Sequence, residues 1–216
     1  WENLFTTKPV FPHCDIYKGV LEQVIATKLE FLQSAPPIKI GVSVAPSYLG
    51  ARSSVAIGLL AYQLEKRFKK TLHPRGGQRI GFTRNFYNTH DCNTANNLVD
   101  VILQSSCTPP FTPVMVRQGQ VVLDGGLVDN VPIDGLDFAH GGRILVMLTR
   151  RYSYPDVFKR IYKNCELIYV QPSRPVAISS WDYSRQELMP ITYQQGLTDF
   201  KTYLSSDIFQ NPPRFA

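Results

Sequence analysis

The sequence predicts an α/β fold, a three-layer α/β/α sandwich built around a mainly parallel central sheet. Stretches rich in β-branched residues alternate along the chain with stretches of helical periodicity, which is the order typical of α/β layering. The run RILVMLT at 143–149 is apolar without interruption, as in strands that a parallel sheet buries on both faces. Charged residues make up 19% of the 216 residues and hydrophobic residues 44%, a composition that fits a buried core better than a solvated helical bundle.

The first half of the chain predicts helices and strands in turn. Residues 15–34 carry apolar side chains near helical spacing, with Asp15 as the N-cap and the prolines of 35–37 as the stop. Residues 38–46 are rich in β-branched side chains and predict a strand. The other elements expected here are a helix over 53–70 capped by Ser53 and Ser54, a loop over 73–78 and a strand over 79–88.

The second half opens with a helix over 94–106, which the prolines that follow bring to an end. Two short strands are expected over 114–118 and 120–124, and Gly119 between them predicts a hairpin. The remaining expected elements are a strand over 143–149, a helix over 155–165, a strand over 166–172 and a terminal helix over 184–205.

Composition narrows the classes of partner. The longest apolar runs are far too short to span a bilayer. The net charge is +6, and part of it lies in 65–79, where cations suit the end of a helix as well as they suit an anionic lipid or nucleic acid. Zinc-finger, helix-turn-helix and ribonucleoprotein patterns do not occur, so we expect no nucleic-acid partner.

The cysteines do not point to a metal or a disulfide framework. The four are scattered along the chain, and none forms a C-x-x-C pair with another, so we interpret them as buried free thiols. We expect no metal and no other cofactor. The cysteines are Cys14, Cys92, Cys107 and Cys165.

The stretch VVLDGGLVDNVPID at 121–134 is the main candidate for a site. Asp124 closes a predicted strand, and ligands of α/β sheets bind at the carboxyl ends of strands. Gly125 and Gly126 follow at once, which permits either a positive φ or the close approach of other backbone. The alternative is that Asp124 only caps a turn that the glycines make tight.

Four short matches in one order are more specific than DGG alone. They are SS at 105–106, FTPV at 111–114, DGG at 124–126 and DNVP at 129–132. This ordered set resembles the patatin-like phospholipase family. The resemblance extends to the segments WENLFTTKPVF, DIYKGVLEQVI, RILVMLTR, ELIYVQPSRPV and WDYSRQELMPITYQQGLTDFKTYL, and it is strongest over 100–135.

The resemblance implies a lipid acyl hydrolase that uses a Ser-Asp dyad and an acyl-enzyme. Asp124 would be the dyad acid, within the motif that Gly125 and Gly126 complete, and a lipid or acyl ester would be the substrate. A dyad needs no placed histidine, so we expect the histidines to be structural. Ser105, Ser106 and Asn130 are candidates for lining the site, with ordinary packing as the alternative for the two serines. The histidines are His13, His73, His90 and His140.

The family's nucleophile lies in G-x-S-x-G, and this motif does not occur in 1–216. The nearest imitation is GVSVA at 41–45, with Ser43 in the serine position. We reject it because Ala45 stands where the elbow needs glycine and the residues predict a continuous strand. We therefore expect 1–216 to be one patatin-like domain without its N-terminal nucleophile and oxyanion segment. That missing part of the same protein is the expected partner, and the isolated chain is expected to be inactive.

A non-catalytic module remains an alternative, in which a patatin-like fold binds anionic membranes or a protein partner. The net positive charge and the aromatic residues suit binding to an anionic lipid surface. The complete DGGLVDNVP at 124–132 argues against this alternative, because a binding module has no need of that acid. We expect a cytoplasmic or peripheral-membrane location, with possible membrane contact as part of either function.

Overall fold

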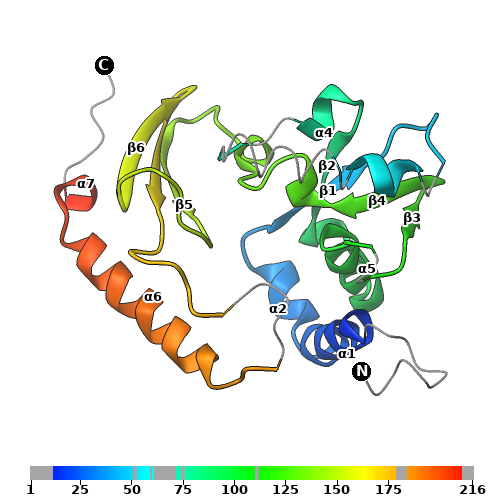
Figure 1. Ribbon diagram of the computed structural model, residues 1–216, viewed down its shortest axis with the longest axis horizontal. Coiled ribbons are helices and arrows are strands. Elements are labelled where there is room, and N and C mark those ends of the chain that lie inside the picture. Colours follow the sequence, from blue (N-terminus) through cyan, green and yellow to red (C-terminus); the bar gives the residue numbers. More distant parts are fainter. Residues whose placement is uncertain are drawn as a thin grey trace. The chain divides into compact units, whose positions relative to one another are not determined.

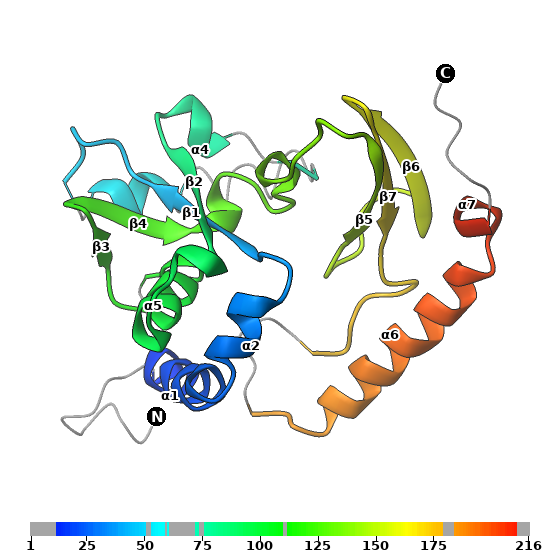
Figure 2. The same cartoon turned by 180° about the vertical axis from the view of Figure 1, so that it is seen from behind.

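The computed structural model describes residues 12–50, 53–58, 60, 72–73, 76–109, 112–178 and 184–210 (Figures 1 and 2). The chain divides into two compact units, Trp1–Leu136 and Asp137–Ala216, and each is described by itself. The expected single domain over 1–216 stays a prediction. No helix within the described ranges is long and apolar enough to cross a membrane.

The first unit is built on a four-stranded sheet with the order β2-β1-β4-β3. Its strands are β1 (Lys39–Val44), β2 (Thr83–Asn88), β3 (Met115–Arg117) and β4 (Gln120–Asp124). β1 pairs antiparallel with β2 and with β4, and β3 and β4 form the expected hairpin, in which Gln118 and Gly119 have positive φ. Asp124 is the last residue of β4, and its register partner is Val42 in the central strand β1.

Helices cover both faces of this sheet. Val42 and Val44 share one face with Val122, because alternate residues of a strand point to the same side. On that side α5 (Ala95–Ser105) packs against the sheet and α1 (His13–Ala26) against α5, as Figure 1 shows. On the other side, Gly58 of the helical stretch 53–58 lies against Leu123. The first unit therefore has the expected α/β/α layering.

The first unit also contains shorter helical elements. They are α2 (Leu29–Ser34), α4 (Gly76–Arg79) and the 3-10 turns η2 (Thr89–Asp91), η3 (Gly125–Leu127) and η4 (Ile133–Gly135).

The second unit is a three-stranded sheet with the order β5-β7-β6, accompanied by α6 (Leu188–Leu204) and α7 (Asp207–Gln210). β5 (Gly142–Met147) is parallel to β7 (Cys165–Val170), whereas β6 (Val157–Tyr162) is antiparallel to it. Every residue of β7, the central strand, is buried.

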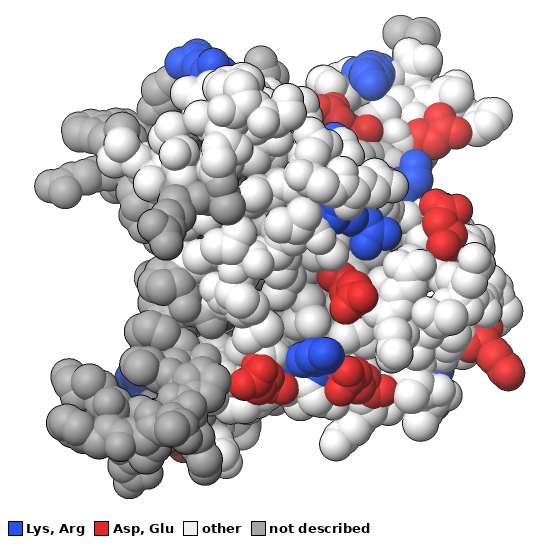
Figure 3. All heavy atoms as spheres, turned by 90° about the vertical axis from the view of Figure 1, so that its right-hand side faces the viewer, with Lys and Arg blue, Asp and Glu red and all other residues white. Residues whose placement is uncertain are grey.

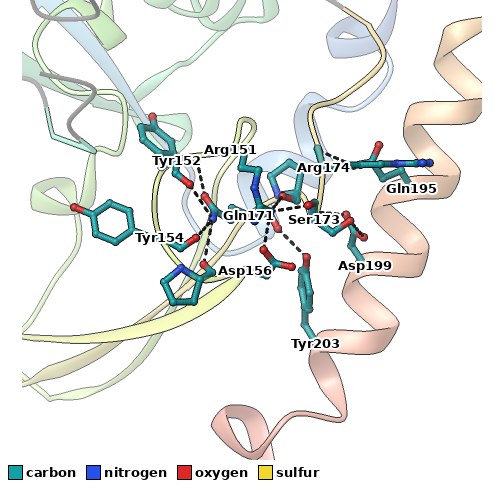
Figure 4. A network of polar contacts seen from close by, with 12 residues as sticks. Arg151, Tyr152, Tyr154, Asp156, Gln171, Ser173, Arg174, Gln195, Asp199 and Tyr203 are labelled. Atoms are coloured by element: carbon teal, nitrogen blue, oxygen red, sulfur yellow. Dashed lines mark hydrogen bonds and ion pairs between the residues drawn. The ribbon is translucent and has the colours of Figure 1, made fainter. Parts of the chain in front are cut away.

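A buried amide organises the end of β7. The Nε2 of Gln171 donates to the carbonyl oxygens of Tyr152, Tyr154 and Pro155, and its Oε1 accepts from the Tyr152 amide at 2.7 Å (Figure 4). The Tyr203 hydroxyl of α6 donates to the Gln171 carbonyl at 3.0 Å. Figure 4 also shows Arg151 directed at Asp156 and at the backbone near 172–173. These contacts join the loop before β6, the end of β7 and α6.

The α/β class is confirmed, but the mainly parallel sheet is not what the described strands form. Among them only β5 and β7 pair in parallel, and the apolar run at 143–149 that suggested a parallel sheet does supply β5. The sheet of the first unit is antiparallel because a tight hairpin joins β3 to β4, and β1 lies between β4 and β2 with opposite direction to both.

The helix expected over 155–165 is wrong, since β6 occupies most of this range. Val157, Phe158 and Ile161 favour an extended chain, and β7 offers an unpaired edge to it. Phe158 stacks on Tyr169 of β7 with ring centroids 4.7 Å apart. A residue with positive φ, Lys163, turns the chain between the two strands.

Several expected boundaries also move. The helix expected over 15–34 divides into α1 and α2 at Thr27, whose hydroxyl donates to the Val24 carbonyl, and Pro12 rather than Asp15 occupies the N-cap. The strand expected over 79–88 begins at Thr83, because Gly81 has a positive φ. Ser54 donates its hydroxyl to the Gly50 carbonyl instead of capping. Beyond residue 58, most of the helix expected over 53–70 lies outside the described residues.

Candidate functional site

Asp124 is held firmly at the end of β4. Its amide donates to the Cys107 carbonyl at 2.8 Å, and its carboxylate oxygen Oδ1 accepts from the Gly126 amide at 2.6 Å. Burial raises the pKa of the Asp124 carboxyl, while the hydrogen bonds from Gly126 and from the Thr108 side chain act in the opposite direction. A half-buried carboxylate with a raised pKa is a stronger base than an exposed aspartate.

Gly125 and Gly126 are explained by close approach and not by positive φ, which neither of them adopts. A Cβ on Gly125 would overlap the carbonyl oxygen of Gly41 in β1. A Cβ on Gly126 would lie 2.8 Å from Asn130 Oδ1 and 2.9 Å from Asp124 Oδ1. The two glycines therefore let the chain turn directly against the central strand, with the Asp124 carboxylate and the Asn130 amide beside Gly126.

The serines of this region direct their hydroxyls to backbone carbonyls. Ser105 donates to Gly41 at 2.7 Å, and Ser106 donates to Ile102 at 2.9 Å, four residues back in α5. Ser43 is fully buried in β1 and donates to the Asp124 carbonyl at 2.8 Å. The rejection of Ser43 as a strand-to-helix elbow is consistent with its place in the middle of a strand. The hydroxyls of Ser105 and Ser43 therefore hydrogen-bond the backbone around the turn and not the Asp124 carboxylate.

A buried ionic group that no sequence pattern predicts lies beside the turn. Asp129 is 6% exposed, and its Oδ2 lies 2.9 Å from a guanidinium nitrogen of Arg84 in β2. His73 Nδ1 lies 3.1 Å from Asp129 Oδ1, which agrees with a structural role for this histidine. Asp129 belongs to a motif that the sequence displays, but no pattern marks Arg84 or His73 as its partners, because both are far away along the chain.

Three of the four cysteines are buried free thiols, as expected, and Cys14 is half-exposed. Burial is the main cause that raises the pKa of the Cys107 thiol. Within the described ranges, no three histidine, cysteine or acidic side chains are grouped as a metal ion would require.

Charge does not gather on the face of the molecule shown in Figure 3. Acidic and basic side chains lie interspersed there among uncoloured ones. Most of the basic stretch 65–79 lies outside the described residues.

The comparison with protein families agrees with the motif. Residues 10–137, more than half of the chain, match the model of the family described as patatin-like phospholipase. The matched range contains Asp124 and its turn, whereas the resemblance of the later segments lies beyond it and stays a prediction. Searches with this sequence against curated proteins and against solved structures gave no match. The chain therefore belongs to the patatin-like phospholipase family, which at the family level is one of lipid acyl hydrolases.

Proposed function

We propose that this chain supplies the acid of a Ser-Asp dyad in a lipid acyl hydrolase, and that Asp124 is that acid. The observation that carries the proposal is the half-buried Asp124 carboxylate, held by the Gly126 amide at the end of β4 inside the family match. A carboxylate in such a place can orient a serine hydroxyl and accept its proton.

In the proposed reaction, the serine oxygen attacks the carbonyl carbon of the ester while its proton passes to Asp124. The tetrahedral intermediate collapses, the alcohol leaves with that proton, and an acyl-enzyme remains. Water then attacks the acyl-enzyme, with Asp124 again accepting the proton and returning it to the serine.

The serine would come from polypeptide outside 1–216, as would the oxyanion loop. This part of the proposal rests on the missing G-x-S-x-G and on the hydroxyls of Ser43, Ser105 and Ser106, which are bonded to backbone carbonyls. In this view 1–216 is the distal part of one patatin-like domain, and its first partner is the remainder of the same protein.

The competing proposal is an inactive module that binds anionic membranes. One feature favours it, an apolar stripe on α1 formed by Ile16, Val20 and Val24, each more than half exposed. The charges beside that stripe are mixed, since Lys18 pairs with Glu22 at 3.7 Å, so α1 does not present a basic face. The hydrolase proposal accounts for more of what is observed, because a membrane-binding module would not need the turn that holds the Asp124 carboxylate.

The test is turnover of short p-nitrophenyl esters by the full-length protein and by its Asp124→Asn variant. The substitution keeps the size and removes the base, so kcat should fall by about 100-fold or more. Asp134→Asn is the control, because Asp134 is an exposed acid of the same segment, and it should retain turnover. A folded Asp124→Asn protein with undiminished kcat would refute the dyad. Flotation with anionic liposomes without any esterase activity would support the membrane module instead.

A further inference from the structure

The segment after Asp124 is closed by Asp129. The Asp129 amide donates to the Gly125 carbonyl at 3.1 Å, and Asp129 Oδ1 accepts from the Val131 amide at 3.0 Å. Asp129 therefore bonds to both ends of the stretch from Gly125 to Val131, with its amide at Gly125 and its carboxylate at Val131.

Side chains from β1 and β2 bind the segment 124–129 at two points. Arg84 in β2 lies opposite Ser43 in β1, and these two residues reach the two ends of the turn. The Ser43 hydroxyl holds the Asp124 carbonyl at 2.8 Å, and the Arg84 guanidinium holds Asp129 at 2.9 Å. The side chains of Arg84 and Asp129 are 11% and 5% exposed, so water screens their attraction only weakly.

The ion pair of Arg84 and Asp129 is linked to Asp124 through Gly126. Asn130, the neighbour of Asp129, places its Oδ1 beside Gly126, next to the position that Asp124 Oδ1 also approaches. The Gly126 amide is the one that binds Asp124. A shift of Asp129 would carry Asn130 with it and alter the place of that amide.

We propose that Arg84 and Asp129 are positioning residues for the dyad acid, whose buried ion pair fixes the turn that presents the Gly126 amide to the Asp124 carboxylate. This inference rests on the proposed function. It assigns to β2 a part in the reaction, although Arg84 itself would touch neither the substrate nor the serine.

Removing one partner alone would leave the charge of the other without its nearest counterion, which destabilises the fold for reasons unrelated to the reaction. Only the longer contact of Arg84 with Asp134, or the contact of Asp129 with His73, would remain. The test variant is therefore the double substitution Arg84→Gln with Asp129→Asn. It removes one charge of each sign, so the net charge is unchanged, and asparagine still offers an oxygen to the Val131 amide. The matched control is Asp134→Asn, which removes the longer, exposed contact to Arg84 at 3.4 Å and keeps the pair of Arg84 with Asp129.

The experiment measures kcat and KM of the full-length protein for a short p-nitrophenyl ester across pH. In the folded double variant we expect kcat to fall about 10- to 100-fold with KM changed less than about twofold. The acid limb of the kcat profile should move to higher pH, because the Gly126 hydrogen bond lowers the pKa of Asp124 and would be weakened. The titratable neighbour Cys107 stays neutral there, since burial raises the pKa of its thiol.

A purely structural role would lower the melting temperature and leave the acid limb in place. A double variant with the wild-type kcat and acid limb would overturn the positioning role, while an inactive Asp124→Asn protein would leave the proposed function standing. An active Asp124→Asn protein would overturn the function itself. If the double variant does not fold, Asp129→Asn alone is measured in the same way, because Arg84 then keeps its charge and its contact with Asp134. The same two results are decisive.

Discussion

Replacing Gly125 with alanine tests the geometry of the turn most sharply. The new Cβ would overlap the Gly41 carbonyl oxygen and lie 3.0 Å from its carbon. Gly41 belongs to β1, which β2 and β4 hold from both sides, so this backbone has no room to retreat. The change adds a single methyl group, but the turn would have to move away from the sheet to accommodate it.

Overpacking of this kind costs about 1–3 kcal/mol, and the rigid backbone contact favours the upper end. For a chain of this size, about 1 kcal/mol of stability corresponds to roughly 2–4 °C in melting temperature. We therefore expect Gly125→Ala to melt about 6–12 °C below the wild type. Gly19→Ala is the control, because nothing lies within 4 Å of the added Cβ and alanine favours the helix α1.

The assay is thermal unfolding followed by circular dichroism, with wild type, Gly125→Ala and Gly19→Ala measured side by side. Gly19→Ala should melt at or slightly above the wild-type temperature. If Gly125→Ala melted within about 1 °C of the wild type, the close approach of the turn to β1 would be refuted. The explanation of the double glycine would then have to be abandoned.

Three further predictions concern other parts of the chain. Gln171→Glu should lower the free energy of unfolding by about 2–3 kcal/mol in a urea titration, because a carboxylate would face three carbonyl oxygens; an unchanged midpoint would contradict the network. The ion pair with Lys159 is the main cause that lowers the pKa of Glu166, so Glu166→Gln should cost about 2 kcal/mol at pH 7. A carboxyl with a lowered pKa stabilises the fold fully above its unfolded pKa, so this difference should shrink as the pH falls below about 4 and disappear below the lowered pKa of the folded protein; a constant difference would count against the pairing. A thiol reagent should modify Cys14 in the native protein and reach the other thiols after unfolding; equal native rates would contradict their burial. Those other thiols are Cys92, Cys107 and Cys165.

Asp124 could be proposed as a dyad acid from the sequence because the signal for it is local. Asp124, its two glycines and the DNVP that follows lie within nine consecutive residues, and the strand before them is an unbroken apolar run. The sequence left two explanations for the two glycines. Sequence allowed either a positive φ or close packing, and only the pairing of β4 with β1 decides for the second.

Long-range pairing explains what could not be predicted. Arg84 and Asp129 are 45 positions apart in the sequence, and nothing near Arg84 marks it as the partner of a particular acid. The stretch 155–165 has apolar residues in adjacent pairs, a pattern that fits a helix as well as a strand. Pairing with β7 and the stacking of Phe158 on Tyr169 decide for the strand.

Labelling with a fluorophosphonate probe tests the pairing of Asp124 with a serine most directly. Such a probe loses fluoride when an activated serine oxygen attacks its phosphorus, and mass spectrometry then locates the modified residue. In the full-length protein the adduct should form on a serine outside 1–216, and Asp124→Asn should abolish it while Asp134→Asn does not. Undiminished labelling in a folded Asp124→Asn protein, or an adduct on Ser43, Ser105 or Ser106, would contradict the dyad.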